Sequence, residues 1–298
     1  MTPFGVKEGD PVQQRSRVFF SVLIASILVA GGVLALAFQA FLNPPDFSQM
    51  KTQIEVRIKL ANGQDSTRKV GPQTADWVPI SQVSNKLLFA IISSEDTSFY
   101  SHSGIDVHEV KESLKKDLKE KKWARGGSTI TQQVIKNTFL TPEKTLWRKV
   151  KEVVYAFQLE REFKKNQILE FYVNLVEWGP GMYGIRQAAN VYFGKSPSEL
   201  TAKEGAFLAL LLPSPRKYFV YFKNKELTQW AGNRLDKIVM IMNSMGFLTE
   251  EEYQSAQSES LWGKSDYVSD TPGAEEVIPS DEGAPPLLEP VEETEIEE

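Results

Sequence analysis

The chain has 298 residues and no cysteine, which excludes disulfides, thiolate zinc sites and cysteine nucleophiles. Two histidines leave little room for a histidine-rich metal site. The net charge of −5 is unevenly distributed, because residues 266–298 contain twelve acids and neither Lys nor Arg. Removing these twelve negative charges leaves +7 for residues 1–265. A basic body indicates an anionic partner such as phosphate, nucleic acid or lipid headgroups, but charge alone is equally compatible with a plain solvated surface.

Residues 18–42 contain no charge and predict a transmembrane helix. At about 1.5 Å per residue they can cross a hydrocarbon core of roughly 30 Å. They exceed the apolar stretch of a signal peptide, although residues 35–37 (Ala-Leu-Ala) keep cleavage open as an alternative. Arg15 and Arg17 precede the segment, so residues 1–17 are expected in the cytoplasm and the rest of the chain in the periplasm of a bacterial cell.

The segment after the apolar helix, residues 43–75, predicts a short β-hairpin stem. Residues 54–60 alternate apolar and polar side chains, and Asn62-Gly63 follows as a turn signal before a second polar strand that ends near Val70. From residue 76 to residue 262 the pattern is mainly helical. Residues 263–298 are rich in acids and proline, which predicts a disordered tail.

Two helices are expected within the helical region. One is basic and amphipathic, and is suited either to an anionic membrane surface or to ordinary packing through its stripe of Val107, Val110, Leu114 and Leu118. The other opens at Thr141-Pro142, with Thr141 as the N-cap. Its expected buried face is formed by Leu146, Val150, Val153, Val154 and Phe157.

Glu95 is the first candidate for chemistry. It follows an apolar run, residues 87–92, at whose edge a carboxylate would be partly desolvated. Desolvation raises the pKa of a carboxyl group, which suits a general base. The alternative is that Glu95 or Asp96 caps the next turn, and this acid pair taken alone favours the cap.

Residues 125–137, RGGSTITQQVIKN, are the second candidate. The run has more uncharged polar groups than a core helix needs, which fits hydrogen bonding to a hydroxyl-rich or phosphorylated ligand. A solvated helix start is an equally weighted alternative. A third candidate is the acid Glu152, because Arg148 and Lys149 precede it by four and three residues and would share its helix face. That arrangement fits either an anionic ligand or a weak surface ion pair.

Two motifs are excluded. Gly179, Gly181 and Gly184 satisfy G-x-G-x-x-G, but residues 167–178 are expected to be helical, so no strand precedes the motif as dinucleotide binding requires. Three S-x-x-K matches occur without S-D-N or K-T-G, so no penicillin-binding transpeptidase site is indicated.

The order of five sequence blocks is far more specific than any single motif. The blocks are SSEDTSFYSHSGID, RGGSTITQQVIKN, RKVKEVVYAFQLEREFKKNQILEFYVN, WGPGMYGIRQAANVYFGK and LTAKEGAFLALLLPSP, over about residues 77–214. In this order the chain resembles the family 51 peptidoglycan glycosyltransferases, specifically the monofunctional biosynthetic type. The resemblance covers neither the hairpin stem nor the acidic tail.

The resemblance implies a mainly α, lysozyme-like domain with a smaller helical jaw near the membrane. It implies polymerisation of lipid II, with Glu95 as the base and Glu152 near the donor diphosphate, where it could hold a divalent cation (Mg or Mn). It further implies a set of substrate-binding residues and a set of structural residues in the motifs. The first set is Ser128, Gln132, Gln133, Lys136, Lys144, Arg148 and Lys149, and the second is Asp96, Phe99, His102, Gly104 and Asn137.

Expected partners are lipid II, the nascent glycan, the membrane and other proteins of cell-wall synthesis or division, and no nucleic acid. Two other functions stay open. A lytic transglycosylase or lysozyme-like enzyme would cleave glycan, but it has no use for a cluster of Lys and Arg at a diphosphate. The second open function is an inactive scaffold of the wall-building machinery. The presence of both Glu95 and Glu152 counts against it.

Overall fold

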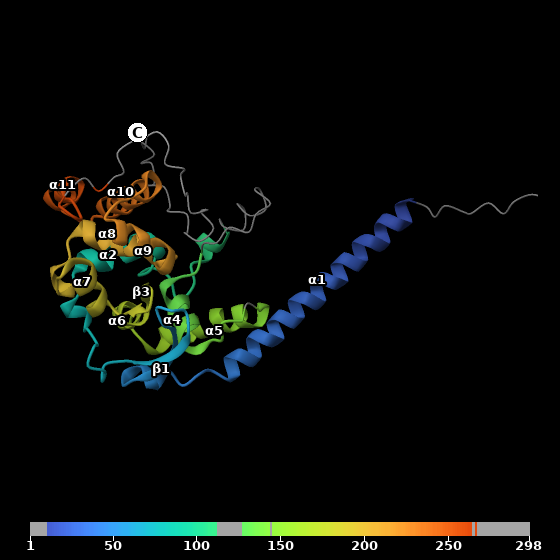
Figure 1. Cartoon of the computed structure of the whole chain (residues 1–298). Coiled ribbons are helices and arrows are strands. Elements are labelled where there is room, and N and C mark those ends of the chain that lie inside the picture. The colour runs from blue at the N-terminus through green and yellow to red at the C-terminus, as the bar shows by residue number, and fades with distance from the viewer. Residues whose placement is uncertain (1–10, 112–126, 144, 264–265, 267–298) are drawn as a thin grey trace, which may run out of the picture.

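The computed structural model describes residues 11–111, 127–143, 145–263 and 266. Its first element is the long helix α1 (Pro11–Leu42), which extends away from a body of shorter helices (Figure 1). The 24 residues Phe19–Leu42 have a mean hydropathy of 2.5 and are largely exposed, so the described residues contain one helix long and apolar enough to cross a membrane. The predicted apolar helix is therefore confirmed.

The end of α1 is attached to the body by two hydrogen bonds. Gln158 donates from Nε2 to the carbonyl of Phe41 over 3.0 Å, and the hydroxyl of Tyr155 donates to the carbonyl of Asn43 over 3.1 Å. Both donors lie on α5 (Leu146–Glu162). The acceptors lie at the helix end, where carbonyls lack intrahelical partners.

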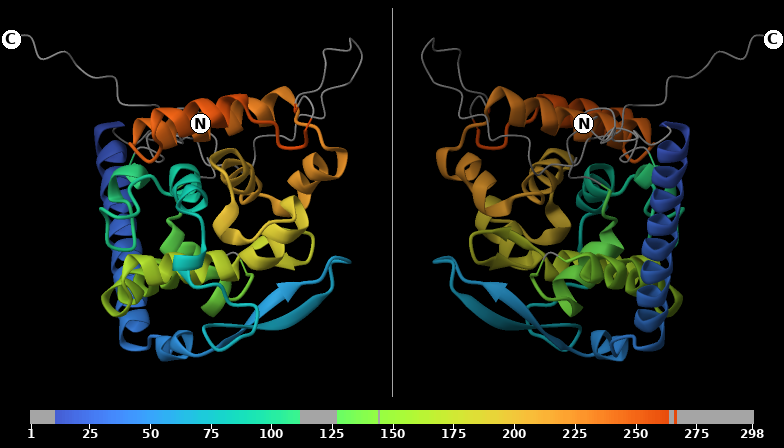
Figure 2. Two further views of the ribbon diagram at one scale, coloured as in Figure 1. Left: turned by 90° about the vertical axis from the view of Figure 1, so that its left-hand side faces the viewer. Right: turned by 90° about the vertical axis from the view of Figure 1, so that its right-hand side faces the viewer.

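The predicted hairpin follows a short 3₁₀ helix, η1 (Phe47–Lys51), and is confirmed. Strand β1 (Ile54–Lys59) pairs antiparallel with β2 (Asp65–Val70) at the foot of the body (Figure 2). Its tip is fixed by the hydroxyl of Tyr183, which accepts from the Lys59 amide over 2.8 Å, and by Gly181, where an added Cβ would lie 2.5 Å from the Ala61 amide nitrogen. The hairpin is thus a fixed wall of the body.

The body is mainly helical, as the sequence predicted. Helices α2 (Asn85–Glu95), α8 (Ala202–Leu211) and α10 (Gln229–Ser244) pack on one another, and α4 (Ile130–Phe139) packs on α5, α6 (Lys165–Leu175) and β1. A two-stranded ribbon joins α6 to α7. The remaining elements are η2 (Ile80–Gln82), β3 (Glu177–Gly179), β4 (Met182–Tyr183), α7 (Ile185–Phe193), η3 (Pro197–Glu199), α9 (Pro215–Asn224) and α11 (Glu250–Ser258).

The ribbon corrects one expectation. Helix α6 ends at Leu175, and residues 177–179 form strand β3, where the sequence indicated a helix up to residue 178. This strand pairs antiparallel with β4, and its sheet contains no parallel strand in the part of the chain that the structure describes, so the dinucleotide motif remains excluded.

Helix α5 corrects two more expectations. It begins at Leu146 after the N-cap Thr145, whose side chain accepts from the Arg148 amide, and not at Thr141-Pro142. The face expected to be buried is only partly so: Leu146 is 66% exposed and Phe157 46% exposed, whereas Val150, Val153 and Val154 are half-buried. The residues that α5 buries are Glu152, Tyr155, Ala156 and Leu159.

Two other expectations concern residues 107–126 and the start of the acidic tail. The basic amphipathic helix falls largely on residues 112–126, outside the described residues. Asp266, which the sequence placed in the tail, is buried, and its carboxylate lies 3.1 Å from Nζ of Lys203 and accepts from the Leu261 amide. The packed domain therefore continues beyond residue 262, where the sequence ended it.

Candidate active site

Glu95 is the last residue of α2, and the helix that carries it is almost wholly buried. Leu87, Ile91 and Ile92 are at most 1% exposed, and Glu95 itself is 9% exposed. Its Oε2 accepts from Nε2 of Gln133 over 2.8 Å, whereas its buried Oε1 has no partner among the described residues. A buried carboxylate with one oxygen unoccupied can accept a proton from a bound hydroxyl group.

Burial is the main cause that raises the pKa of Glu95 above its ordinary value. The hydrogen bond from Gln133 opposes this rise, as do the positive charges of Arg234 and Lys136. Desolvation favours the protonated acid and the three opposing groups favour the carboxylate. Glu95 therefore combines a raised pKa with contacts that support its ionised form.

Asp96 differs from Glu95 in its contacts, although the two are adjacent. Its Oδ2 accepts from the Ile130 amide at the start of α4 over 3.0 Å, and its Oδ1 lies 2.9 Å from Nε2 of His102. Helix N-termini have unpaired amides that a carboxylate satisfies. Asp96 thus joins the end of α2 to the start of α4, and His102 holds Asp96 in place.

The loop that follows Asp96, residues 97–106, also touches α5. Gly104 has φ +84°, and an added Cβ would lie 2.9 Å from the carbonyl carbon of Ala156. Its carbonyl accepts from Oγ1 of Thr129 over 2.7 Å. Phe99 is completely buried in the same loop, with the Lys165 ammonium 4.5 Å from its ring centroid. A glycine is required at position 104 because the loop meets a helix backbone.

The two adjacent glutamines of α4 have different surroundings. Gln133 connects Glu95 to the hydroxyl of Tyr172, which donates to its Oε1 over 3.2 Å. Gln132 is 2% exposed, and its Oε1 accepts from the Thr129 amide in a capping box. The side chain of Gln132 therefore stabilises the start of α4, and its contact with a substrate stays a prediction.

Glu152 is the second buried acid and is surrounded by cations. Nζ of Lys149 lies 2.5 Å from its Oε1, and an NH group of Arg148 lies 3.4 Å from its Oε2. Lys149 also donates to the hydroxyl of Ser128 over 3.0 Å. The helical spacing that the sequence indicated therefore brings Glu152, Lys149 and Arg148 together.

Lys136 and Arg148 line one pocket of about 660 Å³ between α4 and the hairpin. Lys136 is exposed at the pocket. Desolvation by the surrounding protein lowers the pKa of its ammonium group, and the negative charges of Glu152 and Glu95 oppose this shift. Asn137 is exposed and lines the same pocket. Lys144 lies outside the described residues.

Three residues of this region were not assigned a role from the sequence. Tyr172 positions Gln133, and Arg234 acts on Glu95 by its charge. Glu109 has its pKa raised to about 7, chiefly by burial and then by the charges of Asp96 and Asp106. Only the fold places these residues near Glu95, because their positions in the sequence carry no spacing signal.

No cluster of three or more metal-ligating side chains occurs among the described residues. At Glu152 both carboxylate oxygens face cationic groups, as given above. A divalent cation prefers several oxygen ligands. The side chains around Glu152 therefore fit an anionic group better than a metal held by protein alone.

A buried acid near Lys136, which lines a pocket together with Arg148, is the arrangement expected of an enzyme that transfers a group away from an anionic leaving group. Comparison with known proteins specifies this class further. A family model described as "Transglycosylase" matches residues 63–243, and the chain belongs to that family.

Several curated relatives carry related names. The chain is 36% identical over 238 residues to a biosynthetic peptidoglycan transglycosylase of Herminiimonas arsenicoxydans, covering 77% of this chain and 96% of that protein. It is 43% identical over 155 residues to a protein of the same name from Nitrosomonas eutropha, covering 52% and 64% of the two chains. The chain is 33% identical over 264 residues to penicillin-binding protein 1F of Bacillus subtilis. This match covers 87% of this chain and 36% of that protein.

Proposed function

We propose that this protein polymerises lipid II into β-1,4-linked glycan strands and releases undecaprenyl diphosphate. Family membership and the names of the relatives support a peptidoglycan glycosyltransferase. The single observation that carries the mechanism is the buried Glu95 with one carboxylate oxygen unoccupied.

Glu95 acts as the general base in this proposal. Its free oxygen takes the proton of the acceptor's 4-hydroxyl as that oxygen bonds to the anomeric carbon of the donor. The bond from the anomeric carbon to the diphosphate breaks, and its electron pair leaves with the diphosphate. Gln133 holds the other carboxylate oxygen during the transfer.

The leaving diphosphate gains negative charge, so fixed cations stabilise the transition state. Lys136 and Arg148 line the pocket next to α4, and Lys149 is held by Glu152 and Ser128. In this role Glu152 orients the cations. A glycan-cleaving enzyme would have no diphosphate for these groups to bind, so the cationic pocket favours synthesis over cleavage.

A divalent cation (Mg or Mn) is a separate proposal. Glu152 would contribute one carboxylate, and the remaining ligands would have to be diphosphate oxygens and water, which is how magnesium is commonly held. When bound, such an ion would neutralise charge on the diphosphate. The steps assigned above to Glu95, Gln133 and the cations do not depend on it.

We further propose that α1 anchors the protein in the bacterial inner membrane as a single pass, with residues 1–17 in the cytoplasm and the helical body in the periplasm. The exposed apolar segment Phe19–Leu42 of α1 supports the anchor, and Arg15 and Arg17, which precede this segment within the same helix, support the orientation. The lipid-linked substrate and the membrane are then the first partners.

The test is polymerisation of purified lipid II by the full chain in detergent micelles, with and without EDTA. Glycan strands sensitive to a muramidase are the expected product. Consumption of preformed glycan instead would assign the chain to the lytic class, and the absence of both activities would leave the scaffold role.

A further inference from the structure

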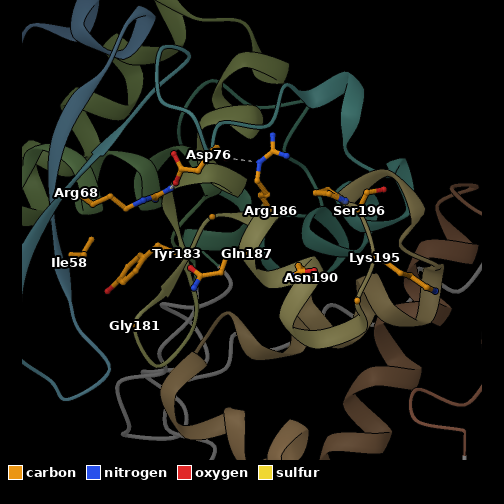
Figure 3. A pocket seen from close by; sticks show the side chains of 13 residues that line it. Ile58, Arg68, Asp76, Gly181, Tyr183, Arg186, Gln187, Asn190, Lys195 and Ser196 are labelled. Atoms are coloured by element: carbon orange, nitrogen blue, oxygen red, sulfur yellow. Dashed lines mark hydrogen bonds and ion pairs between the residues drawn. The ribbon is translucent and has the colours of Figure 1, made fainter.

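A second cavity adjoins the pocket lined by Lys136 and Arg148, which is called the catalytic pocket from here on. It measures about 700 Å³ and is enclosed by the hairpin, strand β4, helix α7 and residues 194–197 (Figure 3). Ile58 and Tyr183 line both this cavity and the catalytic pocket. The two cavities are therefore neighbours with a common wall, and the Tyr183–Lys59 hydrogen bond fixes that wall.

Helix α7 presents two amides to this cavity. Gln187 and Asn190 are exposed, lie three residues apart on one face of the helix, and make no side-chain hydrogen bond within the described part of the chain. In the view of Figure 3, Tyr183, Gln187, Asn190 and Lys195 follow one another across the cavity. Each free amide offers both a donor and an acceptor, which suits hydroxyl and acetamide groups.

The charged groups of the cavity differ in how they are compensated. Arg68 pairs with Asp76, and Lys195 pairs with Glu204 at 2.8 Å. Arg186 instead donates to the backbone carbonyls of Asp76 and Trp77 and, within the described residues, has no carboxylate at ion-pair distance. The cavity therefore combines neutral amides with one cation that no acid neutralises, a combination suited to a neutral polar chain bearing carboxylates.

We propose that this cavity binds a distal part of the growing peptidoglycan strand while its reducing end occupies the catalytic pocket. The acetamido sugars contact Gln187 and Asn190, and a carboxylate of a stem peptide contacts Arg186. This inference rests on the proposed function, because a strand that grows at its reducing end is present only if the enzyme is a polymerase. The cavity adds a holding site that lets the strand remain attached between additions.

The test uses two matched double variants. Gln187→Ala/Asn190→Ala removes the free amides, and alanine favours the helix, so the fold is retained. The control is Gln229→Ala/Asn233→Ala, the same residue types on exposed positions of α10, where they bond only to each other through their side chains. Both are made in the wild-type chain and in a Glu95→Gln background, which prevents turnover.

Binding is measured first, by calorimetry in detergent micelles, with a soluble tetrasaccharide that carries stem peptides and no lipid. In the Glu95→Gln background the α7 variant should bind about tenfold more weakly, as expected for the loss of two or three hydrogen bonds, and the α10 variant should bind normally. With lipid II as substrate, the α7 variant should start at the normal rate but make shorter strands.

Equal affinity and equal strand length in the α7 variant and the wild type would overturn the holding site. An equal loss in the α10 variant would also overturn it, since the effect would not belong to the cavity. Failure of the proposed function can be told apart from failure of the holding site. The first would appear as a wild-type chain that makes no glycan from lipid II, and the second is measured by tetrasaccharide binding, which needs no turnover.

Discussion

Gln133 donates a hydrogen bond of 2.8 Å to one carboxylate oxygen of Glu95 and leaves the other oxygen buried and without a partner among the described residues. An unsatisfied buried acceptor costs free energy, so it is uncommon in a folded protein. The asymmetry orients the carboxylate and keeps one oxygen available for a proton. The predictions below follow from this geometry and from the groups that support it.

The substitution Glu95→Gln is expected to abolish glycan synthesis from lipid II, because an amide cannot take a proton from the acceptor. The side chain keeps its shape, and its oxygen can still accept from Gln133, so the fold should persist. Strand formation and the circular dichroism spectrum are measured together. Strands of normal length from this variant would refute the assignment of Glu95 as the base.

The raised pKa of Glu95 also predicts a pH-dependent stability. The folded protein keeps the Glu95 proton at pH values where the unfolded chain, with an ordinary pKa near 4.5, has lost it. Raising the pH from 4.5 through the folded pKa therefore destabilises the wild type relative to Glu95→Gln, by at most about 1.4 kcal/mol per pH unit. Denaturant unfolding at several pH values measures the difference. A constant difference between the two proteins over this window would show that the pKa is not raised.

The substitution Glu152→Gln is expected to reduce polymerisation by at least about tenfold, because Lys149 and Arg148 lose the charge that orients them. Any stimulation by Mg or Mn should disappear with it. Initial rates are compared with EDTA and with added metal for both proteins. An unchanged metal response in the variant would remove Glu152 from the proposed metal site.

The substitution Gly104→Ala is expected to destabilise the fold more than Gly246→Ala. Both glycines have a left-handed φ, +84° and +70°, which costs an alanine about 1–2 kcal/mol. Only at position 104 does the added Cβ also meet backbone, at 2.9 Å from Ala156, while nothing lies within 4 Å of it at position 246. The free energies of unfolding should differ by about 1 kcal/mol or more. Equal losses would mean that the loop moves aside without cost.

The sequence predicted the elements whose signals are local. The uncharged run predicted α1, and strict alternation with Asn62-Gly63 predicted the hairpin. The roles of Glu95 and Glu152 came from the order of the sequence blocks, since Glu95 taken alone favoured a helix cap and Glu152 taken alone was compatible with a surface ion pair. The hydrogen bond from Gln133 to Glu95 joins residues 38 positions apart, which no periodicity indicates.

Local signals failed where two solutions were chemically equivalent. Thr141 and Thr145 can both cap a helix, and Pro142 favoured the first, but Thr145 makes the bond. The apolar residues of α5 were assigned to the core, but Leu146 and Phe157 are exposed, because periodicity does not show which apolar residues of a helix are covered. Gln132 and Gln133 are the same residue type at adjacent positions, so the sequence does not distinguish them. The folded structure shows that Gln132 caps α4 and that Gln133 contacts Glu95.

The attachment of α1 to α5 sets the depth at which the chemistry takes place. Tyr155 and Gln158 hold the carbonyls of Asn43 and Phe41, and Glu152 lies one turn before Tyr155 on the same helix. With α1 in the bilayer as proposed, the height of Glu152 above the hydrocarbon is a fixed dimension of the molecule. Each residue added to or removed from the apolar helix changes that height by up to about 1.5 Å. The lipid-linked substrate proposed above would then be selected by how far its diphosphate stands from the bilayer, as well as by its sugars.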